Sequence, residues 1–207
     1  HARIGRTGLL ARVPKQSQMQ LAAADNLAYQ AACFERASQC GHAPRLHRVL
    51  APSQRLPRGA LIVDFIEGRP PKLPADLAAI ATALGRIHRL PMPPAAARAP
   101  LKDAADPIAD LIAEVEAQAE HIPAAQLEPR SAELIGEALE QLRAATARSD
   151  RPPKTLISFD AHPGNFILRA DGSAVLVDLE KGRYSYPSLD LAHASLARDE
   201  YVLAGEP

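Results

Sequence analysis

A turn late in the chain is expected to bring an amide and a carboxylate side chain close together. Asp171-Gly172 is typical of a two-residue type I′ hairpin turn, because that turn needs positive φ at both central positions. Asp171 itself is expected only to form the turn. In such a hairpin Asn165 is predicted to lie opposite Asp178, with Cβ atoms roughly 4.5 to 5.5 Å apart. This pair suits Mg²⁺, which takes one or two carboxylates and leaves other positions to water and phosphate.

Two more carboxylates are expected at the open end of this hairpin. Asp160 precedes Asn165 across a turn at Pro163-Gly164, which can return its carboxylate to the same place. Glu180 follows Asp178 by two residues, so both lie on one side if the chain is extended. Three carboxylates and an amide gathered there would repel one another without a cation. The set therefore favours a divalent-metal site over four unrelated caps and turns.

These residues belong to motifs that resemble a known family. Ser158–Asn165 (SFDAHPGN) and Val177–Glu180 (VDLE) are similar to the catalytic and metal-binding loops of the aminoglycoside phosphotransferase and choline kinase family, which is related to protein kinases. Leu61–Gly68 resembles its hinge, Leu84–His88 a helix ending in Leu-His, and Asp190–Ala192 the Asp-Leu-Ala after the metal loop. The resemblance runs from about residue 9 to residue 194.

The resemblance implies an α+β, two-lobed, protein-kinase-like fold. Residues 1–66 would form a small, strand-rich, nucleotide-binding N-terminal lobe with an incomplete Gly-rich loop, since only Gly5 and Gly8 precede its first strand. Residues 67–207 would form a larger helical lobe with an inserted β-hairpin, ending before the helices that usually complete the substrate pocket. The implied activity is ATP-dependent transfer of the γ-phosphate to a hydroxyl of a small molecule, such as an aminoglycoside or choline.

Carried over by position, the motifs assign roles to the polar residues. Asp160 would be the catalytic base, and Asn165 and Asp178 would hold Mg²⁺, with Glu180 assisting a second ion. Asp190 would brace the catalytic loop from the start of its helix.

The nucleotide would be held by other residues of the N-terminal lobe. The backbone of Asp64 and Ile66 would bind adenine at the hinge, and Arg12, with Lys15 behind it, would contact phosphate.

Two features depart from the family pattern, and one histidine of the matching motifs is interpreted as structural. Ser158 stands where the family usually has His, so the packing of the catalytic loop is expected to differ. A Glu that would pair with the phosphate-contacting base is expected near Gln30, whereas Glu35 lies one and a half helical turns later. His88 is interpreted as a packed structural histidine.

Apolar spacing predicts the elements that position these residues. The first third is expected to contain a strand, a helix and two strands, at Gly8–Val13, Leu21–Gln39, Arg48–Ala51 and Gly59–Phe65. The remainder is expected to be mainly helical, with helices near residues 77–87, from 106, near 134–142 and from 190. Three short strands are expected between the last two helices, at Thr155–Phe159, Phe166–Leu168 and Ala174–Val177.

The composition of the chain limits which partners and which cellular compartment are expected. The 207 residues include 24 basic and 24 acidic side chains without a long basic run, which argues against a nucleic-acid or anionic-membrane partner. No apolar stretch reaches the roughly 18 residues of a membrane span, and the first residues lack the core of a signal peptide. A cytoplasmic protein is expected, and the oligomeric state is left open.

The two cysteines are expected to be buried thiols. Cys33 and Cys40 are seven residues apart in a predicted helix, about 10 Å along its axis, too far for a disulfide. A metal site with His42 and His47 fits no common zinc spacing.

Two other functions remain open beside the phosphotransferase. A relative that binds nucleotide without transferring phosphate is favoured by Ser158, the unassigned Glu and the incomplete Gly-rich loop. A metal-dependent phosphohydrolase could use the same carboxylates, although the hinge-like segment argues against it.

Overall fold

The computed structural model describes residues 1–207 except 16, 18, 120, 123–127, 147–150 and 195–207. The chain divides into two compact units. The first comprises His1–Lys102 and Lys154–Pro207, and the second comprises Asp103–Pro153. The boundary between a 1–66 lobe and a 67–207 lobe stays a prediction.

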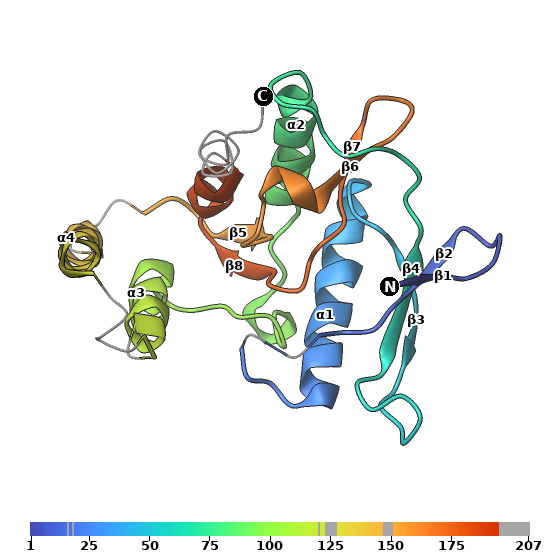
Figure 1. The fold of residues 1–207 in the computed structure, drawn as a ribbon, viewed down its shortest axis with the longest axis horizontal. Helices are drawn as coiled ribbons and strands as arrows, with labels where there is room; N and C mark the ends of the chain where they lie inside the picture. Colours follow the sequence, from blue (N-terminus) through green and yellow to red (C-terminus); the bar gives the residue numbers. More distant parts are fainter. Residues whose placement is uncertain (16, 18, 120, 123–127, 147–150, 195–207) are drawn as a thin grey trace. The chain divides into compact units, whose positions relative to one another are not determined.

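The first unit begins with a four-stranded antiparallel sheet and one long helix (Figure 1). Its strands are β1 (Ala2–Arg3), β2 (Leu9–Arg12), β3 (Leu46–Leu50) and β4 (Ala60–Asp64), in the order β1-β2-β4-β3. Helix α1 (Ala23–Ala37) continues into a 3₁₀ turn, η1 (Ser38–Cys40), which ends at Gly41 with φ +76°. The predicted order of strand, helix and two strands is confirmed, and the strands predicted at 8–13 and 59–65 share one sheet.

The sheet and α1 share one apolar core. Leu27 and Phe34 of α1 are buried in the same cluster as Leu61 and Val63 of β4. At 25 cal/mol per Å², burying side chains of this size stabilises the unit by roughly 1.5 to 3 kcal/mol each. This core fixes α1 and β4, and β4 in turn carries β2 with Arg12 through the pairing of Leu10 with Val63.

The rest of the first unit surrounds the polar loops with short elements. Helix α2 (Leu77–His88) buries Ile80, Leu84 and Ile87 and contacts β5 and β7. The remaining elements are η2 (Ala95–Ala97), β5 (Thr155–Ile157), η4 (Pro163–Asn165), β6 (Phe166–Leu168), β7 (Ala174–Leu176), β8 (Arg183–Ser185) and a helix over 187–194. Strands β5 and β8 form one antiparallel pair, and β6 and β7 form another. Strands β1 and β8 were not predicted from the sequence.

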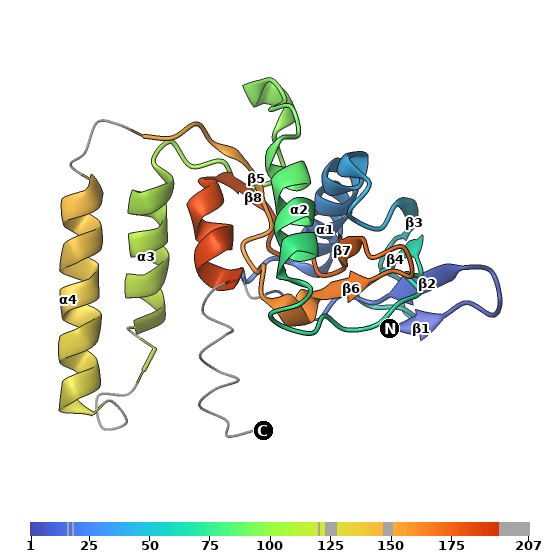
Figure 2. The same ribbon diagram turned by 90° about the horizontal axis from the view of Figure 1, so that it is seen from above.

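The second unit is a pair of helices. Helices α3 (Pro107–Ala119) and α4 (Pro129–Thr146) run antiparallel beside each other (Figure 2). Asp106 caps α3, because its Oδ1 accepts hydrogen bonds from the backbone N–H groups of Ile108 and Ala109 at 3.0 and 3.2 Å. This confirms the predicted helix start. Within the described ranges of both units, no helix combines the length and the apolar character that a membrane crossing requires.

Both cysteines are free thiols; Cys33 is buried, as predicted, whereas Cys40 is only partly buried. Cys33 is buried against Gly182, and burial raises the pKa of its thiol from 9.0 to about 12. Burial also raises the pKa of Cys40, which accepts a hydrogen bond from the backbone N–H of His42. The His42 ring contacts the Ala174 carbonyl at 2.8 Å, and His47 contacts Asp64. These contacts argue against a shared metal site.

Cys33 is expected to resist thiol reagents in the folded protein. A pKa about three units above the ordinary value lowers the reactive thiolate fraction about 10³-fold. Titration with a chromogenic disulfide at pH 8 should therefore show slow native labelling of Cys33 and rapid labelling in denaturant. A Cys40→Ser variant isolates the signal. Rapid stoichiometric labelling of native Cys40→Ser would contradict the burial of Cys33.

Candidate active site

The hairpin that carries Asn165 closes through a longer loop than predicted. Arg169 N–H donates to the Ser173 carbonyl at 2.9 Å, so three residues, 170–172, form the loop. Gly172 has φ +80°, as in a three-residue hairpin that ends on a left-handed residue. The predicted two-residue type I′ turn and its register are therefore wrong by one position. Asp171 does form the turn, because its Oδ1 accepts hydrogen bonds from the backbone and hydroxyl of Ser173.

The corrected register places Asn165 opposite Val177 rather than Asp178. Val177 N–H donates to the Asn165 carbonyl at 2.9 Å, and Phe166 pairs with Leu176. Asp178 is the next residue, so Asn165 and Asp178 are close neighbours without being a directly opposed pair.

Asn165 also contacts the loop that carries the predicted base. Its side-chain Nδ2 donates to the backbone carbonyl of Asp160 at 2.8 Å. Because both the side chain and the backbone of Asn165 are engaged, this one residue joins the Asp160 loop to the strand that leads to Asp178. The use of Nδ2 as a donor leaves Oδ1 as the acceptor end of the amide.

The carboxylate of Asp160 pairs with a lysine that the sequence analysis missed. Lys181 Nζ lies 2.9 Å from Asp160 Oδ2, and both side chains are about a quarter to a third exposed. Lys181 directly follows Glu180 in the sequence. Its contact depends on how the chain turns after Asp178, and no spacing rule gives that turn.

Arg12, the predicted phosphate-contacting base, reaches the same loop from β2. It is 6% exposed, and its guanidinium donates to the Val177 carbonyl at 3.0 Å and to the Asp178 carboxylate. Glu180 Oε2 lies 3.8 Å from the Arg12 nitrogen that donates to Asp178. Arg12 therefore pairs with two of the three predicted metal-binding residues. Lys15 is exposed.

An acidic partner for Arg12 was expected on α1, but Asp178 and Glu180 take this role. Gln30 is buried, and within the described residues its Oε1 has no hydrogen-bond partner. Glu35 is exposed on the same helix. The ring of Phe34 lies 5.7 Å from the Arg12 guanidinium. Helix α1 thus supports Arg12 through an aromatic face, and the carboxylates come from the loop after β7.

The predicted gathering of all three carboxylates is not found. Asp160 pairs with Lys181, whereas Asp178 and Glu180 lie beside Arg12. Among the residues that the structure describes, no three His, Cys, Asp or Glu side chains gather as a metal-binding group.

The donor set nevertheless fits a divalent cation. The Arg12 guanidinium is a cation shared by Asp178 and Glu180, and so marks a place where positive charge is stabilised. Burial and the neighbouring Asp178 carboxylate raise the pKa of Glu180, and Arg12 opposes that rise. Oxygen donors from two carboxylates and the amide of Asn165 are the type that Mg²⁺ takes.

Asp190 organises the loop before Asp160. It is completely buried in the helix over 187–194, and its two carboxylate oxygens accept from the backbone N–H groups of Ser158 and Phe159 at 2.9 and 2.8 Å. His88 Nε2 lies 2.9 Å from Oδ2. Asp190 therefore braces the loop, and His88 is a packed structural residue, as both were predicted.

Ser158 replaces the usual histidine with a different set of contacts. Its hydroxyl donates to Asp190 Oδ1 at 3.0 Å and accepts from the backbone N–H of Asp160 at 3.2 Å. The hydroxyl thus connects the buried carboxylate to the residue that carries the predicted base. This connection explains how the loop is held without the family's histidine.

The hinge-like segment lies at the end of β4. Asp64 accepts hydrogen bonds from the backbone N–H of Arg45 at 3.0 Å and lies 2.7 Å from His47 Nε2. Partial burial raises the pKa of Asp64, but these hydrogen bonds outweigh it and lower the pKa overall. The backbone N–H groups of Asp64 and Phe65 donate to Arg45 and Gly8. Ile66 lies beyond the last of these sheet contacts, and adenine binding by Asp64 and Ile66 stays a prediction.

Comparison with known proteins identifies relatives of this fold. An aminoglycoside phosphotransferase from Streptomyces rimosus, solved with ADP and streptomycin, is 22% identical, with a TM-score of 0.54 over 86% of this chain and 68% of that one. A choline kinase from Streptococcus pneumoniae is 20% identical, with a TM-score of 0.62 over 96% and 65%. An aminoglycoside phosphotransferase in a ternary complex with ADP and hygromycin B is 14% identical, with a TM-score of 0.63 over 83% and 61%.

These neighbours confirm the predicted α+β, two-lobed, protein-kinase-like fold. The chain spans about two thirds of the length of each of these solved relatives. No curated protein matches the sequence. A family model described as the phosphotransferase enzyme family matches residues 4–204. Because this model spans nearly all of the chain, the protein belongs to the phosphotransferase enzyme family.

Proposed function

We propose that the protein is an ATP-dependent phosphotransferase that transfers the γ-phosphate to a hydroxyl of a small molecule. The observation that carries this proposal is the double engagement of Asn165, whose side chain holds the Asp160 loop and whose backbone holds the strand leading to Asp178. A base and a charge-neutralising centre must keep a fixed separation for in-line transfer. Asn165 supplies such a frame.

Each residue has a separate task in this mechanism. Asp160 would orient the acceptor hydroxyl and take its proton, while Lys181 holds the Asp160 carboxylate in place. Asp178 and Glu180, with Asn165, would hold Mg²⁺, which supplies charge neutralisation of the phosphates when bound.

Nucleotide binding is assigned to the sheet. Arg12 would contact the phosphates from β2, because its buried guanidinium already stands beside the metal-binding carboxylates. The backbone of Asp64 and Ile66 would bind adenine. Solved relatives hold ADP, AMP or GDP, which supports a nucleotide substrate.

The acceptor is proposed to be a hydroxyl-bearing small molecule, as in the relatives solved with streptomycin and hygromycin B. A cytoplasmic location, without a nucleic-acid or membrane partner, is part of the same proposal and rests on composition.

A nucleotide-consumption screen of the full-length protein tests the proposal. ATP and Mg²⁺ would be supplied with a panel of hydroxyl-bearing metabolites and antibiotics, and ADP and acceptor phosphate would be measured together. Acceptor-dependent ADP with equal phosphorylated product is expected. Binding without turnover would instead indicate the nucleotide-binding relative, which the pairing of Arg12 with both carboxylates favours. Acceptor-independent release of inorganic phosphate would indicate the phosphohydrolase.

Asp178→Asn is expected to weaken Mg²⁺-dependent nucleotide binding by at least about tenfold, the lower end of losses caused by disturbing a metal site. Metal-free nucleotide binding should change much less, because the carboxylate acts through the cation. Isothermal titration with and without Mg²⁺ measures both affinities. Asp171→Asn is the matched control, since Asp171 lies in the same hairpin region and only forms the turn. Equal losses with and without Mg²⁺ would exclude Asp178 as a ligand.

A further inference from the structure

Phe159, directly before the proposed base, has a backbone conformation that its side chain disfavours. Its φ is +57°, in the left-handed region where a Cβ crowds the following carbonyl. Gln20 is the other residue with a side chain at positive φ in the described part of the chain. Such conformations persist where the surroundings enforce them, and they are often found at functional sites.

Hydrogen bonds on both sides of Phe159 hold its backbone in this conformation. The N–H of Phe159 donates to the buried carboxylate of Asp190, and the N–H of Asp160 turns back to donate to the Ser158 hydroxyl. Glycine would satisfy the same turn without strain. The turn therefore explains the φ value, but it does not explain a phenylalanine side chain at this position.

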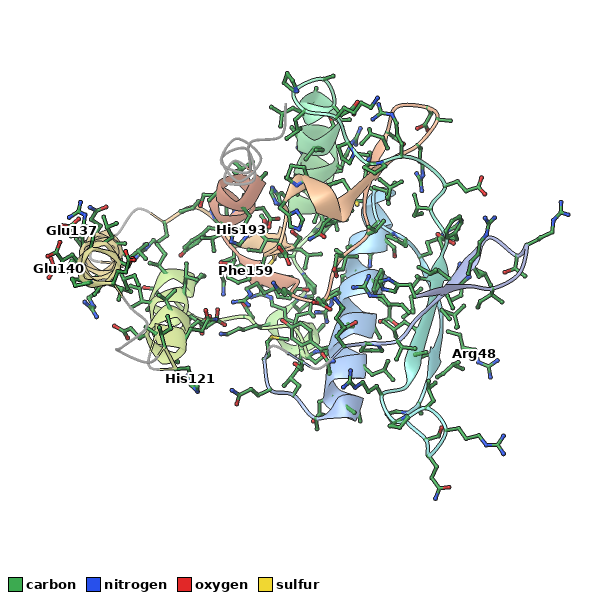
Figure 3. All side chains as sticks on the ribbon, viewed as in Figure 1. Arg48, His121, Glu137, Glu140, Phe159 and His193 are labelled. Carbon is green, nitrogen blue, oxygen red and sulfur yellow. The ribbon has the colours of Figure 1, made fainter. Side chains whose placement is uncertain are left out.

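The phenylalanine ring is held in place on one face and at its edge. The Arg183 guanidinium lies 3.6 Å from the ring centroid, and Arg183 is only 6% exposed. The His193 ring meets the Phe159 ring edge-to-face, with centroids 5.3 Å apart at 74°. Figure 3 shows Phe159 next to His193, which belongs to the helix over 187–194. The ring is held by these two contacts, and the residue as a whole is only partly buried.

We propose that Phe159 is a specificity-determining residue whose open surface forms one wall of the acceptor site beside Asp160. This inference rests on the proposed phosphotransferase function. A fixed aromatic surface next to the base would contact the carbon framework that carries the acceptor hydroxyl and limit its size on that side.

The surroundings of the ring indicate the class of acceptor. Arg183 already uses one face of the ring, and Lys181 lies beside Asp160, so an ammonium group here would meet two positive charges. The inferred acceptor therefore presents an apolar or planar face next to its hydroxyl, and any cationic group lies elsewhere in the molecule.

Substituting Phe159 with a residue that tolerates positive φ isolates the contribution of the ring to acceptor selectivity. Phe159→Gly and Phe159→Asn both fit the left-handed backbone and keep the N–H that donates to Asp190. Gln20→Gly is the matched control, since it changes the other positive-φ side chain, which is exposed. Melting temperature, nucleotide KM and kcat/KM for acceptors of increasing size would be measured for the three variants and the wild type.

Both Phe159 variants are expected to lose about tenfold or more in kcat/KM for the best wild-type acceptor, the scale of losing one apolar contact surface. In both variants the kcat/KM for bulkier acceptors should rise relative to the kcat/KM for that acceptor, while the nucleotide KM stays within about twofold of the wild-type value. Gln20→Gly should keep the wild-type ranking of acceptors. An unchanged ranking in both variants, with normal transfer, would overturn this inference alone. Absence of transfer by the wild type would overturn the proposed function, and this inference with it. If Phe159→Gly does not fold, the Phe159→Asn ranking decides.

Discussion

Asp160→Asn is expected to lower turnover by roughly 10²- to 10⁴-fold, about 3 to 5 kcal/mol of barrier, the range typical of removing a general base. The amide keeps the shape of the carboxylate and loses its basic oxygen. Nucleotide affinity should change little, because Asp160 pairs with Lys181 and would face the acceptor in the proposed mechanism, whereas the phosphates would be held by Arg12 and by the metal at Asp178. Steady-state turnover per folded molecule and nucleotide titration measure the two effects.

A purely structural role for Asp160 predicts a different result. The residue also contributes its backbone, which donates to the Ser158 hydroxyl and accepts from Asn165, and Asn at position 160 would keep both contacts. Loss of the Lys181 ion pair would then lower the melting temperature while folded molecules kept normal turnover. Asp171→Asn serves as the control for replacing an exposed aspartate. A stable Asp160→Asn variant with undiminished turnover would remove Asp160 from the mechanism.

Asp190→Ala is expected to destabilise the fold by about 3 to 5 kcal/mol, as is usual when one partner of a buried charged network is removed. Its carboxylate is completely buried and accepts hydrogen bonds from the N–H and hydroxyl of Ser158 and from the N–H of Phe159. His88 Nε2 contacts the same carboxylate oxygen as the Ser158 N–H. Alanine would leave these donors without an acceptor in the core. Because they belong to the loop that carries Asp160, activity should fall with stability.

Chemical denaturation of Asp190→Ala and of Asp25→Ala measures this effect. Asp25 is an exposed aspartate in the first turn of α1, so its replacement should cost little. A free energy of unfolding for Asp190→Ala within about 1 kcal/mol of the wild-type value would contradict the bracing role, since that is the ordinary effect of a point substitution.

Local patterns predicted the elements better than their pairing. Alternation and helical spacing place β4 and α1 correctly, because these segments are long and share one apolar core. β1 (AR) and β8 (RYS) were missed because neither has a run of apolar residues, whereas the equally short β5, β6 and β7 do. The hairpin register failed because Asp171-Gly172 also suits a three-residue loop with glycine at its left-handed position.

The residues of the site were predicted by motif, and their partners were not. Arg12 was found from its strand, yet its pairing with Asp178 and Glu180 depends on how the loop after β7 returns to β2. Lys181 was missed for the same reason. Ser158 could be recognised as a departure, but its hydrogen bonds to Asp190 and Asp160 require the folded loop. The choice of ion-pair partner depends on tertiary contacts, which local sequence patterns do not reveal.

The fate of the γ-phosphate in a single reaction tests the central claim most directly. The full-length protein, ATP, Mg²⁺ and an acceptor from the screen would be followed by phosphorus NMR, with Asp160→Asn and Asp171→Asn in parallel. The account predicts a new phosphate monoester on the acceptor, equal in amount to the ADP formed by the wild type and Asp171→Asn, and strongly reduced in Asp160→Asn. ADP accompanied only by inorganic phosphate, or a monoester formed equally fast by Asp160→Asn, would contradict it.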